Sequence, residues 1–238
     1  MPVSQDTLVD GRWVQCAVQG QGRPVVVFES GLGADLTAWE KVFSAVANFA
    51  TAFAYSRPGY GSSEWASTPR TGDVVVEELR ATLRKRGLAP PYLLVGHSLG
   101  GLYLQLFARL YPDEVVGLVL VDSSHPTQRA GPRPPQTFWG MLVNLYMTGT
   151  RGREYEALNA TGQQVLAAPP FVGKPVTLLS AGKDPSSDDR SPPQLRRRDL
   201  ARLYPGSRQV WVATGHNIQK LRPEVVIDAI REMVTPVP

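Results

Sequence analysis

One stretch, residues 91–103, constrains the fold of this 238-residue chain more than any other. Residues 92–95 form a short apolar run of the kind that a fully buried parallel strand shows. Gly96-His97-Ser98-Leu99-Gly100 follows directly and has the pattern G-x-S-x-G. Apolar residues then recur at helical spacing, at positions 99, 102, 103, 106 and 110. The stretch therefore predicts a strand, a tight turn and a helix in that order.

The turn is predicted to be a nucleophile elbow, which presents a serine at the tip of a sharp strand-to-helix connection. Ser98 would there adopt a strained backbone conformation, and side chains two residues to either side would collide with the turning chain. Gly96 and Gly100 remove those side chains. The backbone N–H of Leu99, at the helix N-terminus, is expected to point toward an oxyanion formed by attack on a carbonyl.

The sequence G-H-S-L-G-G in this context resembles the α/β-hydrolase superfamily, specifically its small serine esterases and lipases. The resemblance implies a mostly parallel central sheet with helices on both faces and a small cap insertion. It also implies a serine hydrolase that cleaves carboxylic esters through an acyl-enzyme formed on Ser98. Acyl transfer, perhydrolysis and peptidase-type activity would use the same residues. A catalytically quiet ligand-binding homologue is the alternative outside catalysis.

The rest of the chain alternates buried strands with helices, which predicts βαβ crossovers and a mostly parallel sheet. Buried strands are expected at 24–29, 51–56, 115–121, 175–180 and 209–213, and helices at 39–50, 73–86, 194–204 and 224–234. Polar and apolar residues alternate over 12–18, which predicts a half-exposed antiparallel edge strand. We therefore expect one α/β-hydrolase domain over residues 1–238.

The regular pattern breaks between 123 and 171, where prolines and short helical pieces replace the alternation. This segment joins two strands at the end of the sheet where ligands bind in such folds, and it resembles the cap or lid of the superfamily. Its apolar side chains are candidates for lining the substrate pocket, namely Phe138, Trp139, Leu142, Tyr146 and Met147. The same spacing is also typical of a cap that simply packs on the core.

A serine hydroxyl needs a base within hydrogen-bond reach and a third group that holds this base. His216 follows the last expected strand, in Ala-Thr-Gly-His-Asn, so its loop faces the turn across the top of the sheet. The chain order serine, acid, histidine of this fold also requires a late histidine. His216 is the predicted base, and His125 is the alternative. His97 is expected to point away from the site and to have a packing role.

Two carboxylates compete for the role of the acid, which would fix the tautomer of the base and stabilise its imidazolium form. Asp184 follows the next-to-last strand and occupies the position where the superfamily usually carries its carboxylate. It is the predicted acid. Asp122, at the end of the preceding strand, is the alternative because some members of the fold place the acid one strand earlier. Asp188 and Asp189 are weaker candidates in a polar run.

A second donor to the oxyanion is expected from the loop Ser30-Gly31-Leu32-Gly33. This loop matches the His-Gly-x-Gly loop of the superfamily, except that Ser30 replaces the histidine. By that match the backbone N–H of Leu32 is the donor. The alternative interpretation is an ordinary glycine turn.

The basic balance of the chain, a net charge of +4, does not predict a nucleic-acid partner because its basic residues lack interleaved aromatic ones. The runs at 84–86 and 196–198 are expected to be solvated helix faces. No apolar run is long enough to span a bilayer, and no signal peptide is visible, so a cytoplasmic protein is expected. Cys16, the single cysteine, is expected to be a buried structural thiol.

The partner predicted from these residues is a small-molecule ester. Neither a metal nor an organic cofactor is expected. No cluster of His, Cys and Asp has the spacing of metal ligands, and no G-x-G-x-x-G follows a strand.

Overall fold

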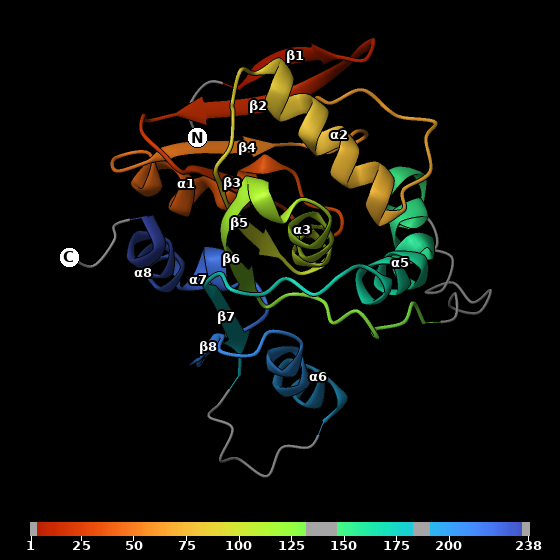
Figure 1. Cartoon of the computed structure of the whole chain (residues 1–238). Helices are drawn as coiled ribbons and strands as arrows, with labels where there is room; N and C mark the ends of the chain where they lie inside the picture. Colours follow the sequence, from red (N-terminus) through yellow and green to blue (C-terminus); the bar gives the residue numbers. More distant parts are fainter. Residues whose placement is uncertain (1–3, 132–146, 183–190, 235–238) are drawn as a thin grey trace.

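The computed structural model describes residues 4–131, 147–182 and 191–234, and within these ranges an eight-stranded sheet organises the chain (Figure 1). The strands are β1 (Gln5–Val9), β2 (Arg12–Gln19), β3 (Val25–Glu29), β4 (Thr51–Tyr55), β5 (Tyr92–His97), β6 (Val115–Val121), β7 (Val176–Ala181) and β8 (Arg208–Val212). Their spatial order is β1-β2-β4-β3-β5-β6-β7-β8. β2 pairs antiparallel with β1 and β4, and the remaining pairs are parallel. The predicted mostly parallel sheet is confirmed.

Helices cover both faces of this sheet, as the sequence predicts. They are α1 (Glu40–Val46), α2 (Gly72–Lys85), α3 (Leu99–Leu110), α5 (Gly149–Ala167), α6 (Pro192–Leu200), α7 (Ile218–Leu221) and α8 (Pro223–Val234), with 3₁₀ turns η1 (Leu36–Trp39), η2 (Pro112–Glu114) and η3 (Ala201–Leu203). Figure 1 shows α1 and α8 together on one side of the sheet and α2, α3 and α5 on the other.

The central strand β3 shows why the pattern of the buried strands is continuously apolar. Val25 and Val27 belong to the core between the sheet and the α2–α3 layer, whereas Val26 and Phe28 belong to the core under α1 and α8. All four side chains are almost fully buried. A strand covered on both faces has no polar side, so alternation is absent from its sequence.

The edge-strand prediction for residues 12–18 is wrong. The strand exists as β2 and is antiparallel, but β1 pairs along its outer side, with Gln5 opposite Cys16. β1 has only two buried residues among five, and this weak pattern does not distinguish a short edge strand from a loop. Cys16 is fully buried, as expected, and burial raises the pKa of its thiol to about 11.

The segment between β6 and β7 contains one long helix, α5, where the sequence pattern indicates only short helical pieces. α5 packs against α2 and α3, and it buries Leu158 and Val165 in the core that these helices share. Residues 132–146 of this segment lie outside the described ranges. Across the described residues, none of the helices combines the length and the apolar character that crossing a membrane requires.

Candidate active site

Ser98 lies at the tip of the connection between β5 and α3. Its backbone has φ 53° and ψ −122°, a conformation that L-residues rarely adopt. A Cβ at Gly96 would lie 2.6 Å from Cα of Gly101, and a Cβ at Gly100 would lie 2.4 Å from the carbonyl oxygen of Glu29. Both glycines are therefore required sterically. The geometry around Ser98 is that of the sharp, strained turn expected from the sequence.

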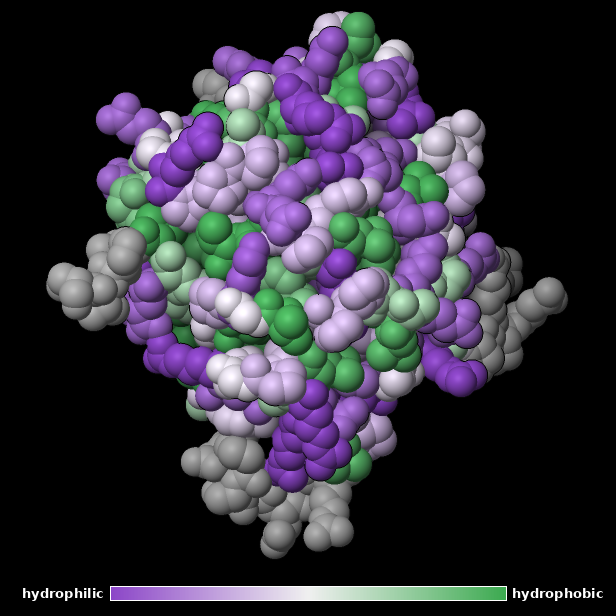
Figure 2. All heavy atoms as spheres, viewed as in Figure 1, coloured by the Kyte–Doolittle hydropathy of each residue, from purple (hydrophilic) through white to green (hydrophobic). Residues whose placement is uncertain are grey.

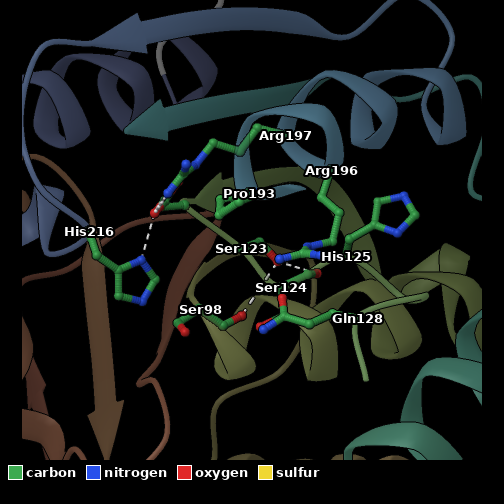
Figure 3. Close-up of a pocket in the computed structure, with 10 residues that line it drawn as sticks. Ser98, Ser123, Ser124, His125, Gln128, Pro193, Arg196, Arg197 and His216 are labelled. Atoms are coloured by element: carbon green, nitrogen blue, oxygen red, sulfur yellow. Dashed lines mark hydrogen bonds and ion pairs between the residues drawn. The ribbon is translucent and has the colours of Figure 1, made fainter. Parts of the chain in front are cut away.

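His216 lies in the loop between β8 and α7 and lines the same cavity as Ser98 (Figure 3). Its Nδ1 is 2.6 Å from Oδ2 of Asp122. An ionised carboxylate only accepts hydrogen bonds, so Nδ1 carries the proton of this bond, and in the neutral tautomer that this contact selects the lone pair is on Nε2. This arrangement joins the predicted base to the carboxylate at the end of β6.

Asp122 directly follows β6, and its carboxylate accepts four hydrogen bonds. Besides His216, its oxygens accept from the backbone N–H of Ala181 at 3.0 Å and from Arg197 Nε and Nη2 at 2.6 and 2.8 Å. Burial alone would raise the pKa of this carboxyl, but the hydrogen bonds from Arg197, His216 and Ala181 outweigh it. They lower the pKa of Asp122 to about 2. The carboxylate is therefore ionised at neutral pH and fixed in orientation.

The predicted acid, Asp184, lies outside the described residues, as do Asp188 and Asp189. Among the described carboxylates, Asp122 is the one that contacts the imidazole of His216. Asp122 also has a positive φ of 41°. Such a conformation in a non-glycine residue is uncommon and concentrates at functional sites.

Arg197 corrects the expectation that the basic run at 196–198 is merely a solvated helix face. The run does lie on a helix, α6, but the Arg197 guanidinium points inward and binds Asp122 with two parallel hydrogen bonds. Its side chain is only 21% exposed. The sequence signal that identifies this role is weak, because an arginine on a polar helix is far more often solvated.

His97 is packed away from the cavity lining, as expected, but it contacts the base. Its Nε2 lies 3.0 Å from the carbonyl oxygen of His216, and the two imidazole rings are 4.6 Å apart. A carbonyl only accepts, so Nε2 of His97 carries the proton. Burial, and secondarily the neighbouring His216, lower the pKa of His97 to about 4. The ring is therefore neutral at pH 7 and supports the His216 loop.

His125, the alternative base, also lines the cavity. Its Nδ1 accepts a hydrogen bond from the backbone N–H of Thr127 at 3.1 Å, and its Nε2 lies 3.3 Å from Asp199. Nδ1 is thus bonded by Thr127, whereas Nε2 lies beside the Asp199 carboxylate without forming a hydrogen bond to a described residue. His125 lacks the buried carboxylate that His216 has, so His216 has the geometry of a general base and His125 does not.

The loop 30–33 approaches the turn that carries Ser98. A Cβ at Gly31 would lie 3.2 Å from Cβ of Ser98 and 2.9 Å from Nδ1 of His97, so only glycine allows this approach. The backbone N–H of Gly33 donates to the hydroxyl of Tyr60 at 3.2 Å. Gly31 therefore allows a close contact between this loop and the turn of Ser98.

A buried arginine fixes that loop from its carbonyl side. Arg57 donates to the carbonyl oxygens of Ser30 at 2.5 Å and Gly31 at 2.9 Å. The same guanidinium pairs with Glu29 at 2.6 Å and with Glu154 of α5 at 2.7 Å. All three charged side chains are 0–1% exposed. This cluster connects the loop beside Ser98 to the helix of the segment between β6 and β7.

The cavity at Ser98 has a volume of about 210 Å³ and a largely polar lining. Ser123, Ser124, Gln128, Pro193 and Arg196 complete its wall beside the residues already named. Of these five, the sequence pattern singles out only Arg196, as part of the basic run 196–198. Of the predicted pocket residues, Phe138, Trp139, Leu142 and Tyr146 lie outside the described residues, and Met147 is half-buried just before α5. In the ranges 4–131, 147–182 and 191–234, no group of three or more His, Cys, Asp or Glu could hold a metal ion.

Comparison with known proteins defines the family. A family model described as "alpha/beta hydrolase fold" matches residues 24–158, which is more than half of the chain. This chain belongs to the α/β-hydrolase fold family. The family match covers Ser98 and Asp122, whereas His216 lies beyond its end.

The relatives and structural neighbours agree with this family. The chain is 34% identical over 122 residues to the uncharacterized protein YbdG of Bacillus subtilis. This alignment covers 50% of the chain and 38% of YbdG. The chain thus spans well under half the length of this relative.

Two solved structures share the fold over nearly their whole length. The enol-lactonase from Burkholderia xenovorans LB400 aligns at a TM-score of 0.69 and 19% identity, over 96% of this chain and 99% of that one. The thermophilic esterase from Thermogutta terrifontis aligns at 0.68 and 22% identity, over 98% and 100%. At such identities the likeness shows the fold alone.

Proposed function

We propose that the protein is a serine hydrolase that cleaves carboxylic esters through an acyl-enzyme on Ser98. The observation that carries the proposal is the shared cavity of Ser98 and His216, with the His216 imidazole bonded at 2.6 Å to the buried carboxylate of Asp122. A nucleophile on a strained turn, a base with a free Nε2 lone pair and an acid that fixes the tautomer are the three parts of such a site.

The acid of the proposed triad is Asp122 in place of the predicted Asp184. Asp122 is ionised, buried and oriented by Arg197, and these properties suit a group that stabilises an imidazolium without taking its proton. Its place at the end of β6 keeps the chain order of serine, acid and histidine.

In the proposed reaction, Nε2 of His216 accepts the proton of the Ser98 hydroxyl as Oγ bonds to the ester carbonyl carbon. The carbonyl electron pair moves onto oxygen and gives a tetrahedral oxyanion. When this intermediate collapses, the bond to the leaving alkoxide breaks, and the imidazolium of His216 protonates that alkoxide. His216 then accepts a proton from water as the water oxygen bonds to the acyl carbon. When this second intermediate collapses, the bond between the acyl carbon and Ser98 Oγ breaks and His216 returns the proton to Oγ, which releases the carboxylic acid and regenerates Ser98.

The oxyanion is proposed to bind the backbone N–H groups of Leu99 and Leu32. Leu99 begins α3, so its amide is one of the helix donors without an intrahelical acceptor. Within the described ranges, the amides of Gly33 and Ala34 are hydrogen-bonded, whereas neither Leu32 nor Leu99 has an acceptor for its amide. Two backbone N–H groups without acceptors beside a nucleophile support the proposal of an oxyanion hole.

The segment 123–171 is proposed to act as a cap over this site within a single domain of residues 1–238. Its first residues, Ser123 to His125, already form part of the cavity wall. Its helix α5 is tied to the loop beside Ser98 through Glu154 and Arg57. The names of these two structural neighbours, an enol-lactonase and an esterase, are consistent with the reaction type proposed for this chain.

The test is hydrolysis of short p-nitrophenyl esters by the wild-type protein and by Ser98→Ala. We expect Ser98→Ala to lose about 10⁴-fold or more in kcat/KM, because nucleophile and base act as one unit. Ser62→Ala, which changes an exposed serine in another turn, is the matched control and retains full activity. Equal turnover by wild type and Ser98→Ala, or none by either, would contradict the proposal.

A further inference from the structure

We infer that this site takes short esters whose acyl or alcohol part carries a carboxylate, and that the guanidinium of Arg196 binds this carboxylate. The inference deepens the proposed ester hydrolysis and rests on it. It assigns a substrate class and a specificity-determining residue that the triad alone does not define.

Arg196 lines the cavity that contains Ser98 and His216. Figure 3 shows its side chain extending from α6 toward Ser123 and Ser124, on the opposite side of the cavity from His216. The neighbouring Arg197 extends from the same helix toward Asp122 and completes the support of the base. Two consecutive arginines therefore reach this site, one bound to the catalytic carboxylate and one directed at the cavity.

The charges that line the cavity do not cancel. Its ionisable groups are Asp122, His125, Arg196, Arg197 and His216. Asp122 and Arg197 form a bidentate ion pair that neutralises both. Burial lowers the pKa of His125; the Asp199 carboxylate opposes this shift and the charge of Arg196 adds to it, so the net direction favours neutral His125 at pH 7.

No described carboxylate forms an ion pair with Arg196. Asp199, on the same helix, instead contacts His125 at 3.3 Å and Arg202 at 2.9 Å. Among the described residues, the cavity therefore holds one positive charge without a counter-charge. A guanidinium in a partly enclosed site binds a carboxylate with two charge-assisted hydrogen bonds, more strongly than it binds water.

The remaining walls suit the same ligand. Ser124 and Gln128 contribute polar groups that can hydrogen-bond a carboxylate or an ester oxygen. The cavity volume of about 210 Å³ is below the range of about 300 to 1,000 Å³ that is usual for sites of drug-sized ligands. Because Arg196 and Ser98 border this one small space, the anionic group would lie only a few bonds from the scissile carbonyl.

A solvated Arg196 is the competing interpretation. The residue also borders an open depression, which is lined in addition by Leu195, Arg198, Asp199 and Arg202. Figure 2 shows hydrophilic side chains gathered over the part of the surface where α6 lies. A purely solvated arginine would make the local electrostatic potential more positive and would attract any anion. It would not bind the carboxylate of an anionic ester at one fixed position in the cavity. The two interpretations therefore differ in how specifically Arg196 acts.

The test compares monomethyl succinate with methyl butyrate, which differ mainly by a carboxylate in place of a methyl group, by pH-stat titration. We expect wild type to prefer the succinate ester at least tenfold in kcat/KM, chiefly through KM. Arg196→Gln should lower the ratio of the two kcat/KM values about tenfold, and Arg196→Lys should restore part of this ratio. The matched control is Arg202→Gln, which removes the same charge from an 83% exposed side chain of the adjoining turn and should keep the wild-type preference within twofold.

The failures of the two proposals are distinguishable. If wild type cleaves both esters equally, or if Arg196→Gln keeps the full preference, this inference is overturned while ester hydrolysis stands. An equal loss of preference in Arg196→Gln and Arg202→Gln also overturns it, because the effect is then general electrostatics. If neither ester is cleaved and a fluorophosphonate fails to label Ser98, the proposed function itself fails.

Discussion

The Nδ1 of His216 and Oδ2 of Asp122 lie 2.6 Å apart, although the two residues are separated by 94 positions in the chain. The sheet order brings β6 next to β7 and β7 next to β8, so the loops after β6 and β8 meet at one end of the sheet. Arg197 binds the same carboxylate from α6. The imidazole of His216 is therefore held by a buried carboxylate that Arg197 holds in turn, and this arrangement would preorganise the proposed base.

Replacing each of the two candidate acids in turn, Asp122 and Asp184, tests which of them serves this base. Asp122→Asn should lower kcat by about 10³- to 10⁴-fold, because the amide no longer fixes the tautomer or stabilises the imidazolium. Asp184→Asn should change kcat less than threefold, and it serves as the matched control. Steady-state kinetics on a p-nitrophenyl ester measure both. An inactive Asp184→Asn beside an active Asp122→Asn would restore Asp184 as the acid.

Arg197 should act on the reaction only through Asp122. Arg197→Gln removes both hydrogen bonds to the carboxylate, so the pKa of Asp122 should rise from about 2 toward its ordinary value. We expect kcat to fall about tenfold with KM little changed, since Arg197 then no longer orients the acid. The Lys variant keeps the charge but loses the bidentate geometry, and it should recover only part of the rate.

The control for this prediction is the double variant Arg197→Gln with Asp122→Asn. If Arg197 acts through Asp122, the double variant should be no slower than Asp122→Asn alone. A further tenfold loss in the double variant would show that Arg197 has a separate role.

The buried neutral His97 should make the stability of the protein depend on pH. Its pKa in the folded protein is about 4, below the unperturbed 6.5, so the unfolded chain binds the proton more readily. The free energy of unfolding is therefore highest, with respect to this group, above pH 6.5. It declines by a total of about 3 kcal/mol as the pH falls through the folded pKa of His97. Urea unfolding from pH 7.5 to 4 measures this slope in wild type.

His97→Gln is the informative comparison for that slope, because glutamine can still donate to the His216 carbonyl but does not titrate. It should flatten the decline between pH 6.5 and 4 relative to wild type. His125→Gln changes another histidine with a lowered pKa and serves as the control for general histidine titration. Parallel slopes for wild type and His97→Gln would contradict the assignment.

The cluster of Arg57, Glu29 and Glu154 should stabilise both the fold and the loop beside Ser98. Glu154→Gln leaves the guanidinium of Arg57 with one carboxylate in a fully buried site. Removing a partner from a buried ion pair typically costs about 3 to 5 kcal/mol, because the remaining charge is uncompensated. We expect a loss at the lower end of that range, because Glu29 remains, measured by urea unfolding at pH 7.

An exposed pair provides the matched control for this cluster. Arg208 and Glu232 form an ion pair in which both side chains are more than half exposed. Glu232→Gln should cost less than about 1 kcal/mol, as exposed pairs do. Equal effects of Glu154→Gln and Glu232→Gln would show that burial of the Arg57 cluster contributes little.

Local sequence patterns predict much of this fold because most of its strands and helices carry a signal of their own. The apolar run before Ser98 and the two glycines around it specify the turn without any distant contact. β1 escaped prediction because its five residues bury only two side chains. α5 escaped because its buried face includes Thr150, Gly152, Glu154 and Thr161, so its hydrophobic periodicity is weak.

The candidate site was predictable only in part, since its parts meet through the order of strands in the sheet. Ser98 and His216 were chosen from motif and chain position. The contact between His216 and Asp122 depends on how far the loops after β6 and β8 reach, and no local pattern encodes that distance. The roles of Arg196 and Arg197 depend on the rotation of α6, because a run of three arginines does not indicate which one points inward.

The role of Ser98 as the nucleophile is tested most directly by locating the residue with which a fluorophosphonate reacts, by mass spectrometry of the digested protein. We expect a single phosphonylated residue, Ser98, at full occupancy in wild type. We also expect no adduct in Ser98→Ala and a strongly slowed reaction in His216→Gln. An adduct on another residue, or labelling of Ser98 that is equally fast without His216, would contradict the proposed triad.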